Sequence, residues 1–496
     1  MPSPGVEPRD VAVVDVGSNS VRLVTYRLEG RAIWTVYNEK VLAGLGREMG
    51  QTGRLSVDGA EAAVAALRRF RAVIDGAASQ EVYVAGTAAV RDAVDRREFV
   101  ARVRREAGLD IRVLTGREEA RYSALGVLAG CPQAEGVVGD LGGSSLELVR
   151  LENDDAGDGV TLALGPFSLG APDDFDADRV RRLTEERLAG CERLRSDEFH
   201  AVGGAWRTMA LIHMAMADYP LKIVHQYDIP ASEALEVVRF VARQSRRSLE
   251  QIEGVSKKRV DILPWAAIVL ESLVERLAMK RITFSAYGLR EGLLYDGMPA
   301  DVRGLDPLIA GCAAIGRRQG VSPELGRAVA DWLAPALATL EPVFGERDAV
   351  LLQAASRLAD IGARLHPEHR ADLAFIQVLH APIAGQGHTE RAFLAATIHA
   401  RYGGSGKTPE TPTIRRLLSR EAMARARVLG LAIRLGCDLA GRAAANLRDS
   451  TLRIDGDRIV VTAAPNCADL LQGEQTGKRA NALANALGMK LEIRAG

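Results

Sequence analysis

The chain has 496 residues, of which 47% are hydrophobic and 26% are charged, a composition typical of a soluble globular protein with several domains. Lys and Arg number 64, and Asp and Glu also number 64, so the overall charge gives no indication of a nucleic acid or a membrane as partner. Five scattered cysteines without a CxxC pair, a polar N-terminus and the lack of a long apolar run exclude a disulfide framework and predict a cytoplasmic protein.

The first predicted feature is a strand, a tight turn and a second strand over residues 11–28. The turn is Asp15-Val-Gly-Ser-Asn-Ser20, in which small residues allow the backbone to approach a ligand closely. A third strand is expected at 31–43, and apolar residues at helical spacing predict a helix from Ser56 to about Ile74. Glu81–Ala85 predicts another strand, which leads into Gly86-Thr-Ala-Ala-Val-Arg91.

Two adjacent glutamates lie in the first turn of a helix that begins at Thr115. Thr115 and Glu118 form a capping box, which gives Glu118 a structural role. Glu119 has no such role, although a first-turn glutamate also interacts favourably with the helix dipole. Because Glu119 lies between two glycine-rich turns in the sequence, it is a candidate for catalysis.

The second glycine-rich turn lies in Val137-Val-Gly-Asp-Leu-Gly-Gly-Ser-Ser-Leu-Glu-Leu-Val149. Its residues from Asp140 to Val149 align without gaps on residues 15–24, with Asp, Gly, Ser, Leu and Val at equivalent places. The N–H groups of such turns can bind an anion, and carboxylates beside them suit Mg²⁺. The repeat predicts two similar domains, each offering one phosphate loop to a shared cleft.

Strands and helices alternate up to about residue 300, which predicts an α/β fold. Val202-Gly-Gly-Ala-Trp-Arg-Thr208 opens a helix in this region. Long Ala/Leu/Arg-rich helices follow to residue 450, and the last residues carry strands and one helix. We therefore expect an all-α domain at 303–450 and a small α+β domain at 451–496, after two α/β domains at 1–130 and 131–302.

Five motifs, in this order, resemble the exopolyphosphatase/guanosine pentaphosphate phosphohydrolase family. They are Val14-Asp-Val-Gly-Ser-Asn-Ser20, Gly86-Thr-Ala-Ala-Val-Arg91, Gly116-Arg-Glu-Glu-Ala120, Asp140-Leu-Gly-Gly-Ser-Ser-Leu-Glu147 and Gly288-Leu-Arg-Glu-Gly292. The resemblance implies duplicated actin-like (ribonuclease H-like) domains of the ATPase superfold, followed by a helical domain of the HD-phosphohydrolase type. It also implies a homodimer that removes the terminal phosphate of polyphosphate or pppGpp with Mg²⁺, and Glu119 as the general base.

The sequence departs from the family pattern at several positions. Ser144 stands where the family has a third glycine, and Trp206 and Arg207 replace small residues of another segment. Ala359 stands where an HD protein has a histidine, so we expect a degenerate metal site there. Five histidines of the helical region have spacings that fit no metal motif; they are His366, His369, His380, His388 and His399.

The residue types suggest separate roles in phosphoanhydride hydrolysis. Asp140 and Glu147, together with Asp15, are the expected Mg²⁺ ligands. Arg91 would contact a phosphate oxygen, and Arg290 would contact another or form a salt bridge with a neighbouring carboxylate. The phosphates would lie against the two loops, which comprise Gly17, Ser18, Asn19 and Ser20, and Gly142, Gly143, Ser144 and Ser145.

Residues 411–450 hold eight arginines against three acidic residues, which predicts a track for a long polyanion. A solvated helix face is the alternative interpretation. The four arginines assigned to the track are Arg415, Arg416, Arg420 and Arg425, the last of which follows Ala424.

These patterns leave four functions open. They are processive exopolyphosphatase activity, pppGpp 5′-phosphohydrolase activity, an actin-superfold small-molecule kinase and an inactive phosphate-binding regulator. Residues 1–300 contain no recognisable aromatic slot for guanine, and Trp206 is explained as well by packing as by stacking. The arginine clusters favour inorganic polyphosphate as the substrate.

Overall fold

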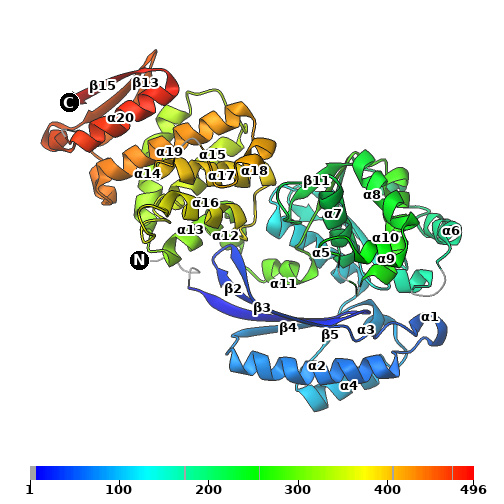
Figure 1. Ribbon diagram of the computed structural model, residues 1–496. Coiled ribbons are helices and arrows are strands. Elements are labelled where there is room, and N and C mark those ends of the chain that lie inside the picture. Colours follow the sequence, from blue (N-terminus) through cyan, green and yellow to red (C-terminus); the bar gives the residue numbers. More distant parts are fainter. Residues whose placement is uncertain are drawn as a thin grey trace. The chain divides into compact units, whose positions relative to one another are not determined.

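The computed structural model describes residues 7–171, 175–255, 257, 259–404, 407–471 and 473–495. The chain forms two compact units, residues 1–304 and residues 305–496. The first unit contains two mixed sheets and both glycine-rich turns, whereas the second is mostly helical (Figure 1). No helix among the described residues is long and apolar enough to cross a membrane.

A five-stranded sheet in the order β3-β2-β1-β4-β5 contains the first turn. β1 pairs antiparallel with β2 and parallel with β4. The strands are β1 (Arg9–Val16), β2 (Val21–Glu29), β3 (Ala32–Val41), β4 (Glu81–Gly86) and β5 (Arg112–Val113). The helices near this sheet are α1 (Met49–Thr52), α2 (Val57–Gly76), α3 (Ala88–Asp92) and α4 (Arg96–Ala107).

Successive side chains of β1 point to opposite faces of this sheet and therefore pack against different helices. Val14 belongs to a buried cluster with Phe70 of α2, which covers one face. Val13 belongs to a second cluster with Leu125 of the helix α5 (Gly116–Gly130) on the other face. Full burial of a side chain of this size contributes about 1.5–3 kcal/mol.

A seven-stranded sheet, with the main order β11-β12-β10-β6-β7-β8 and β9 paired to β7, contains the second turn. β6 pairs antiparallel with β7 and parallel with β10, as β1 does with its neighbours. The strands are β6 (Gly136–Leu141), β7 (Leu146–Glu152), β8 (Asp155–Ala156), β9 (Val160–Leu162), β10 (Glu198–Val202), β11 (Tyr227–Pro230) and β12 (Arg281–Phe284). The helices that follow α5 in this unit are α6 (Ala177–Arg187), α7 (Gly204–Met216), α8 (Ala231–Arg243), α9 (Arg246–Glu250), α10 (Leu263–Arg276), α11 (Leu289–Asp296) and α12 (Ala300–Arg303).

The predicted duplication of the strand–turn–strand unit is confirmed in the hydrogen bonding of the two turns. The N–H of Gly17 donates to Ser20 O at 3.0 Å, and the N–H of Gly142 donates to Ser145 O at 2.9 Å. In register, Asp15 lies opposite Arg22 and Asp140 lies opposite Glu147. The two turns therefore share one backbone geometry but place different charges on the second strand.

Helices α5 and α11 pack closely against each other because glycines line their contact. A Cβ atom at Gly126 of α5 would overlap the carbonyl oxygen of Gly288, and one at Gly292 would overlap the carbonyl oxygen of Tyr122. Both helices contribute to the buried cluster that also contains Val13 of β1 and Val138 of β6. The two sheets of the first unit thus share one hydrophobic core.

The second unit consists of helices and a three-stranded sheet in the order β13-β14-β15. Its longest helix, α19, contacts α14, α17 and α20. The helices are α13 (Pro307–Arg318), α14 (Pro323–Leu337), α15 (Arg347–Arg357), α16 (Arg370–His380), α17 (His388–Arg401), α18 (Thr411–Leu417), α19 (Arg420–Ala440) and α20 (Glu474–Leu487). The strands β13 (Ser450–Asp455), β14 (Arg458–Ala463) and β15 (Lys490–Ala495) lie in the predicted α+β segment. The division of the chain into four domains stays a prediction.

Candidate active site

The two glycine-rich turns face the same cavity, which has a volume of about 180 Å³. A Cβ atom at Gly143 would lie 3.1 Å from Ser18 Cβ, so glycine at this position allows the two loops to approach each other. The N–H of Phe167 donates to Gly143 O at 2.9 Å and holds the second loop in place. Gly17, Ser18, Asn19, Ser20, Gly142, Gly143 and Ser145 all line the cavity.

Four carboxylates line one part of this cavity: Asp15, Glu119, Asp140 and Glu147. Asp15 and Asp140 lie near the ends of the first strands of the two hairpins, and Glu147 lies on β7. Ser123 of α5 donates its hydroxyl to Asp140 Oδ2 at 2.5 Å. Glu147 is 2% exposed, and its Oε1 has no hydrogen-bond partner among the described residues.

Burial and mutual repulsion raise the pKa values of Glu119, Asp140 and Glu147. Burial raises the pKa of Glu119 to about 7, against the lowering effect of Arg91 and with further raising by Asp140 and Asp15. Burial also raises the pKa of Glu147 well above its usual value, assisted by Glu119 and Asp140. Burial raises the pKa of Asp140 as well. Closely spaced carboxylates of this kind are stabilised in the charged form by a hard divalent cation.

Glu119 pairs with an arginine from outside the cavity. Arg91 Nη1 donates to Glu119 Oε2 at 2.6 Å, and Arg91 Nε donates to Asp92 Oδ1 at 3.1 Å. Glu119 lies in the first turn of α5, where the predicted capping box of Thr115 and Glu118 is confirmed. The cap fixes the start of the helix and with it the position of Glu119.

Basic side chains line another part of the same cavity. They are Arg22, Lys40, Arg207, Arg259 and Arg290. Burial, followed by the charges of Arg259, Arg22 and Arg207, lowers the pKa of Lys40 to about 8. Burial and the neighbouring arginines likewise lower the pKa of Arg207 to about 10. Like charges held this close indicate a site that binds a polyanion.

The predicted site residues fall into two groups. Asp15, Glu119, Asp140, Glu147, Arg290 and the loop residues other than Ser144 line the cavity. Ser144 lines a neighbouring hollow together with Arg91 and Ser145, and its role in phosphate binding stays a prediction. Arg290 forms the salt bridge that the sequence left open, with Nη1 3.0 Å from Asp15 Oδ2.

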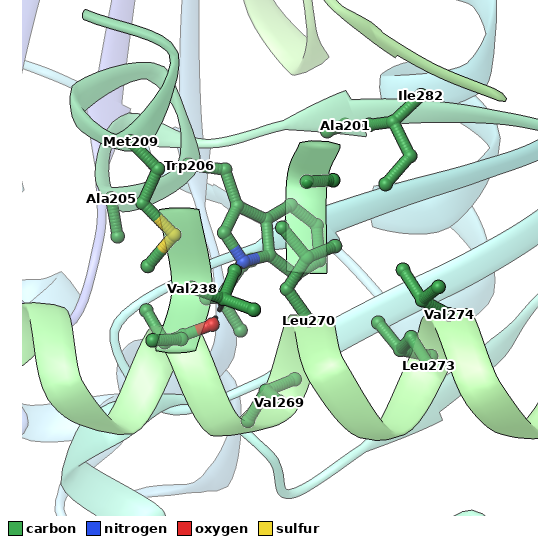
Figure 2. Packing of buried hydrophobic residues seen from close by; sticks show 14 of the residues in the cluster. Ala201, Ala205, Trp206, Met209, Val238, Val269, Leu270, Leu273, Val274 and Ile282 are labelled. Carbon is green, nitrogen blue, oxygen red and sulfur yellow. Dashed lines mark hydrogen bonds between the residues drawn. The ribbon is translucent and has the colours of Figure 1, made fainter. Parts of the chain in front are cut away.

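Trp206 is a packing residue rather than a stacking platform. Its side chain is fully buried between α7 and α10, and its indole N–H donates to Ala266 O at 3.0 Å (Figure 2). The next residue, Arg207, lines the cavity instead. The departure from the family pattern at these two positions therefore adds a core residue and a cation.

Sequence reasoning missed four of the basic residues, which are Arg22, Lys40, Arg207 and Arg259. Lys40 lies near the end of β3, and Arg259 precedes α10. No motif marks either residue. Arg22 had a signal, because it occupies the position in the first hairpin that Glu147 occupies in the second.

Among the described residues of the second unit, the histidines lie in separate polar clusters. The ligand atoms of exposed His366, Glu368 and His369 lie within 4.8 Å of one another. Elsewhere in the described residues, His399 pairs with Asp372 at 3.1 Å and His380 with Glu410 at 3.1 Å.

At the expected HD position, Asp360 is held by two arginines. Its carboxylate lies 3.0 Å from Arg401 Nη2 and 2.9 Å from Arg442 Nε. These two arginines neutralise the negative charge with which Asp360 would bind a metal ion. Ala359, beside Asp360, offers no ligand atom.

The arginines of the predicted track lie on α18 and at the start of α19. Arg415 and Arg420 line a hollow together with Ser419. Arg425 donates through Nη2 to Glu341 O at 2.6 Å. The track itself stays a prediction.

Both units of the chain match sequence models of known protein families. The sequence model of the Ppx/GppA phosphatase family matches residues 24–301, and that of the exopolyphosphatase C-terminal domain matches residues 309–494. Exopolyphosphatase 2 of Mycobacterium tuberculosis is 27% identical over 309 residues, which cover 57% of this chain and 97% of that protein. Exopolyphosphatase 1 of Mycobacterium bovis is 24% identical, over 59% of this chain and 90% of that protein.

Solved structures resemble the chain over a similar share of its length. The Aquifex aeolicus member of the Ppx/GppA family has a TM-score of 0.51 and 26% identity, and the match covers 58% of this chain and 97% of that one. An exopolyphosphatase from Cytophaga hutchinsonii has a TM-score of 0.55 and 22% identity, covering 59% of this chain and 99% of that one, and supports the fold.

Proposed function

The chain belongs to the Ppx/GppA phosphatase family, and we propose that it is an exopolyphosphatase that hydrolyses the terminal phosphoanhydride bond of inorganic polyphosphate with Mg²⁺. One observation carries this proposal: four carboxylates and five basic residues line a single cavity together with the two glycine-rich turns. A polyanion that arrives with a divalent cation satisfies both sets of charges. The exopolyphosphatases among its relatives support the same substrate.

The residues present fit a divalent cation. Glu147 Oε1 is buried without a hydrogen-bond partner among the described residues, and an unpaired buried oxygen costs about 1–3 kcal/mol. We propose that Asp140 and Glu147, together with Asp15, hold Mg²⁺, directly or through water. Bound there, Mg²⁺ would neutralise charge on the phosphate oxygens during transfer.

Glu119 is the proposed general base. Its carboxylate lines the cavity, and a pKa of about 7 suits a group that takes a proton from water at neutral pH. Arg91 would orient Glu119 through the 2.6 Å contact and would offer its remaining N–H groups to a phosphate oxygen.

Other residues of the cavity would bind the substrate. The N–H groups of the loops at 17–20 and 142–145 would hold the terminal phosphates, and Arg22, Lys40, Arg207 and Arg259 would hold the phosphates that follow. Arg290 would contribute to the same binding. The phosphates would thereby be positioned for attack by water in line with the bond that breaks.

The cavity favours an inorganic chain over a guanine nucleotide. No tyrosine, phenylalanine or tryptophan is among the described residues that line it, and Trp206 belongs to the core. The second candidate function, pppGpp 5′-phosphohydrolysis, would use the same site. A small-molecule kinase is the third.

Further properties are proposed from the family resemblance. They are processive hydrolysis along a track at Arg415, Arg416, Arg420 and Arg425, a homodimer in the cytoplasm, and a helical domain of HD type. The pairing of Asp360 with Arg401 and Arg442 supports a structural role for the HD-like segment instead of metal binding.

Orthophosphate release from long-chain polyphosphate and from pppGpp, measured side by side with Mg²⁺, tests the proposal. We expect the higher kcat/KM with polyphosphate. Faster turnover of pppGpp would select the second function, and phosphorylation of an added acceptor by ATP would contradict both hydrolase assignments.

A further inference from the structure

A buried hydrogen bond behind the cavity joins two residues that are far apart in the sequence. The hydroxyl of Tyr26, on β2, donates to Glu291 Oε1, on α11, at 2.5 Å. Tyr26 is 1% exposed and Glu291 is 6% exposed, so water cannot replace either partner. The other oxygen, Glu291 Oε2, accepts from the N–H of Gly288 at 3.0 Å. Both oxygens of this carboxylate are therefore occupied.

Arg290, the residue next to Glu291, lines the cavity. Arg290 Nη1 donates to Asp15 Oδ2 at 3.0 Å, and both residues line the cavity. Arg290 Nε is buried without a hydrogen-bond partner among the described residues. The first turn of α11 thus carries one charged side chain anchored behind the cavity and one directed into it.

Arg290 also interacts with both residues of this hydrogen bond. Burial lowers the pKa of Arg290, but the charges of Glu291, Tyr26 and Asp15 outweigh burial and hold that pKa above its usual value. The hydrogen bonds from the Tyr26 hydroxyl and the Gly288 N–H fix the carboxylate of Glu291, which stabilises the charged guanidinium of Arg290. Tyr26 itself does not line the cavity, so its influence on a ligand passes through Arg290.

We propose that Tyr26 and Glu291 are positioning residues that direct Arg290 toward Asp15 and the substrate phosphate beside it. This inference rests on the proposed function in one respect, namely that the ligand of the cavity is a chain of phosphates. When that ligand binds with its cation on Asp15, Arg290 exchanges the carboxylate for a phosphate oxygen. Tyr26 and Glu291 hold the guanidinium of Arg290 in place during the exchange.

A double-mutant cycle on the full chain tests the inference with inorganic tripolyphosphate as the probe. Tyr26→Phe removes only the hydroxyl. We expect it to raise the dissociation constant of tripolyphosphate, and the KM for polyphosphate, by about fivefold to tenfold, which is less than for a direct hydrogen bond to the ligand because Tyr26 acts through Arg290. In an Arg290→Gln background, the same substitution should leave the dissociation constant nearly unchanged, because the residue through which it acts is gone.

Tyr83→Phe is the matched control. Tyr83 also donates to a glutamate, Glu81 Oε2 at 3.0 Å, and lies outside the cavity. Tyr83→Phe should alter neither the binding of tripolyphosphate nor the KM for polyphosphate. Tm is measured for each variant to detect any loss of stability.

Three outcomes would overturn the inference: an unchanged dissociation constant in Tyr26→Phe, an equal loss in both Arg290 backgrounds, or a fall in Tm with binding intact. A wild-type protein that binds tripolyphosphate but releases no phosphate would contradict the proposed function alone, since the cycle can still be read from binding.

Discussion

Arg91 Nη1 lies 2.6 Å from Glu119 Oε2, so the carboxylate assigned as the general base is held by a cation. The charge of Arg91 opposes the effects of burial and of the neighbouring carboxylates, and the pKa of Glu119 settles at about 7. The pair fixes the orientation of Glu119 without removing its basicity at neutral pH.

Glu119→Gln should lower kcat for polyphosphate by roughly 10²–10⁴-fold, because it removes the base and keeps the shape. Binding of tripolyphosphate, measured by calorimetry, should persist. Glu118→Gln is the control: Glu118 accepts from the N–H of Thr115 at 2.9 Å in the capping box, so its loss should lower Tm slightly and leave kcat near the wild-type value. A Glu119→Gln variant with more than about a tenth of wild-type activity would show that another group is the base.

Arg91→Met should move the acid limb of the pH profile of kcat/KM to higher pH. Arg91 lowers the pKa of Glu119, so its removal raises that pKa above about 7, and more alkali is needed to deprotonate the base. Activity should therefore fall at neutral pH and partly recover at alkaline pH. Arg112→Met, which removes the 2.5 Å contact to Glu118, should leave the profile in place. If both variants keep the wild-type acid limb, Arg91 does not tune Glu119.

Asp140→Asn should raise the Mg²⁺ concentration needed for half-maximal activity. Ser123→Ala should raise it less, since it removes only the 2.5 Å hydrogen bond to the Asp140 carboxylate, worth about 1.5–3 kcal/mol. Activity measured across a Mg²⁺ titration gives both values. An unchanged titration in Asp140→Asn would remove this residue from the metal site.

Lys40→Met should raise the KM for polyphosphate and weaken its dependence on salt and pH. The pKa of Lys40 is lowered to about 8, so its charge and its attraction for phosphate decline as pH rises through that value. The wild type should lose affinity for tripolyphosphate over this interval, and the variant should not. Lys222→Met, which removes an exposed pair with Glu253, serves as the control. Parallel pH curves for the wild type and Lys40→Met would place Lys40 outside the binding site.

Alanine at Arg415, Arg416, Arg420 and Arg425 together should lower kcat/KM for long polyphosphate and leave that for tripolyphosphate unchanged. Long chains would lose many weak electrostatic contacts, so their salt dependence should also decrease. Equal kcat/KM values on long chains for variant and wild type at moderate salt would leave these arginines as a solvated helix face.

The parts of the site that the sequence predicts are those whose geometry is local. The turn at Asp15–Ser20 and its repeat at Asp140–Ser145 depend on a few adjacent small residues, and the place of Glu119 depends on the capping box at Thr115. Each pattern is complete within about ten residues, so the type and the place of the element follow from it.

The basic part of the cavity depends on contacts between distant segments. Lys40 and Arg259 belong to a strand and a loop whose local sequence has no distinguishing pattern, and they meet only when both sheets are assembled. Tyr26 and Glu291 are likewise 265 residues apart. Ser144 shows that adjacency in a loop does not fix which hollow a residue lines, because it lines the neighbouring hollow while the other loop residues line the cavity.

The two hairpins have the same backbone but unlike charges, with Arg22 opposite Asp15 and Glu147 opposite Asp140. A polyphosphate chain reads the same in both directions, so it cannot choose by itself which of its ends enters a site. In the proposed binding mode the unequal hairpins would give the cavity a polarity: the end of the chain would meet Asp140 and Glu147, and a preceding phosphate would meet Arg22. Two hairpins with identical charges would lack that polarity, so this cross-strand difference would suit an enzyme that shortens its substrate from an end.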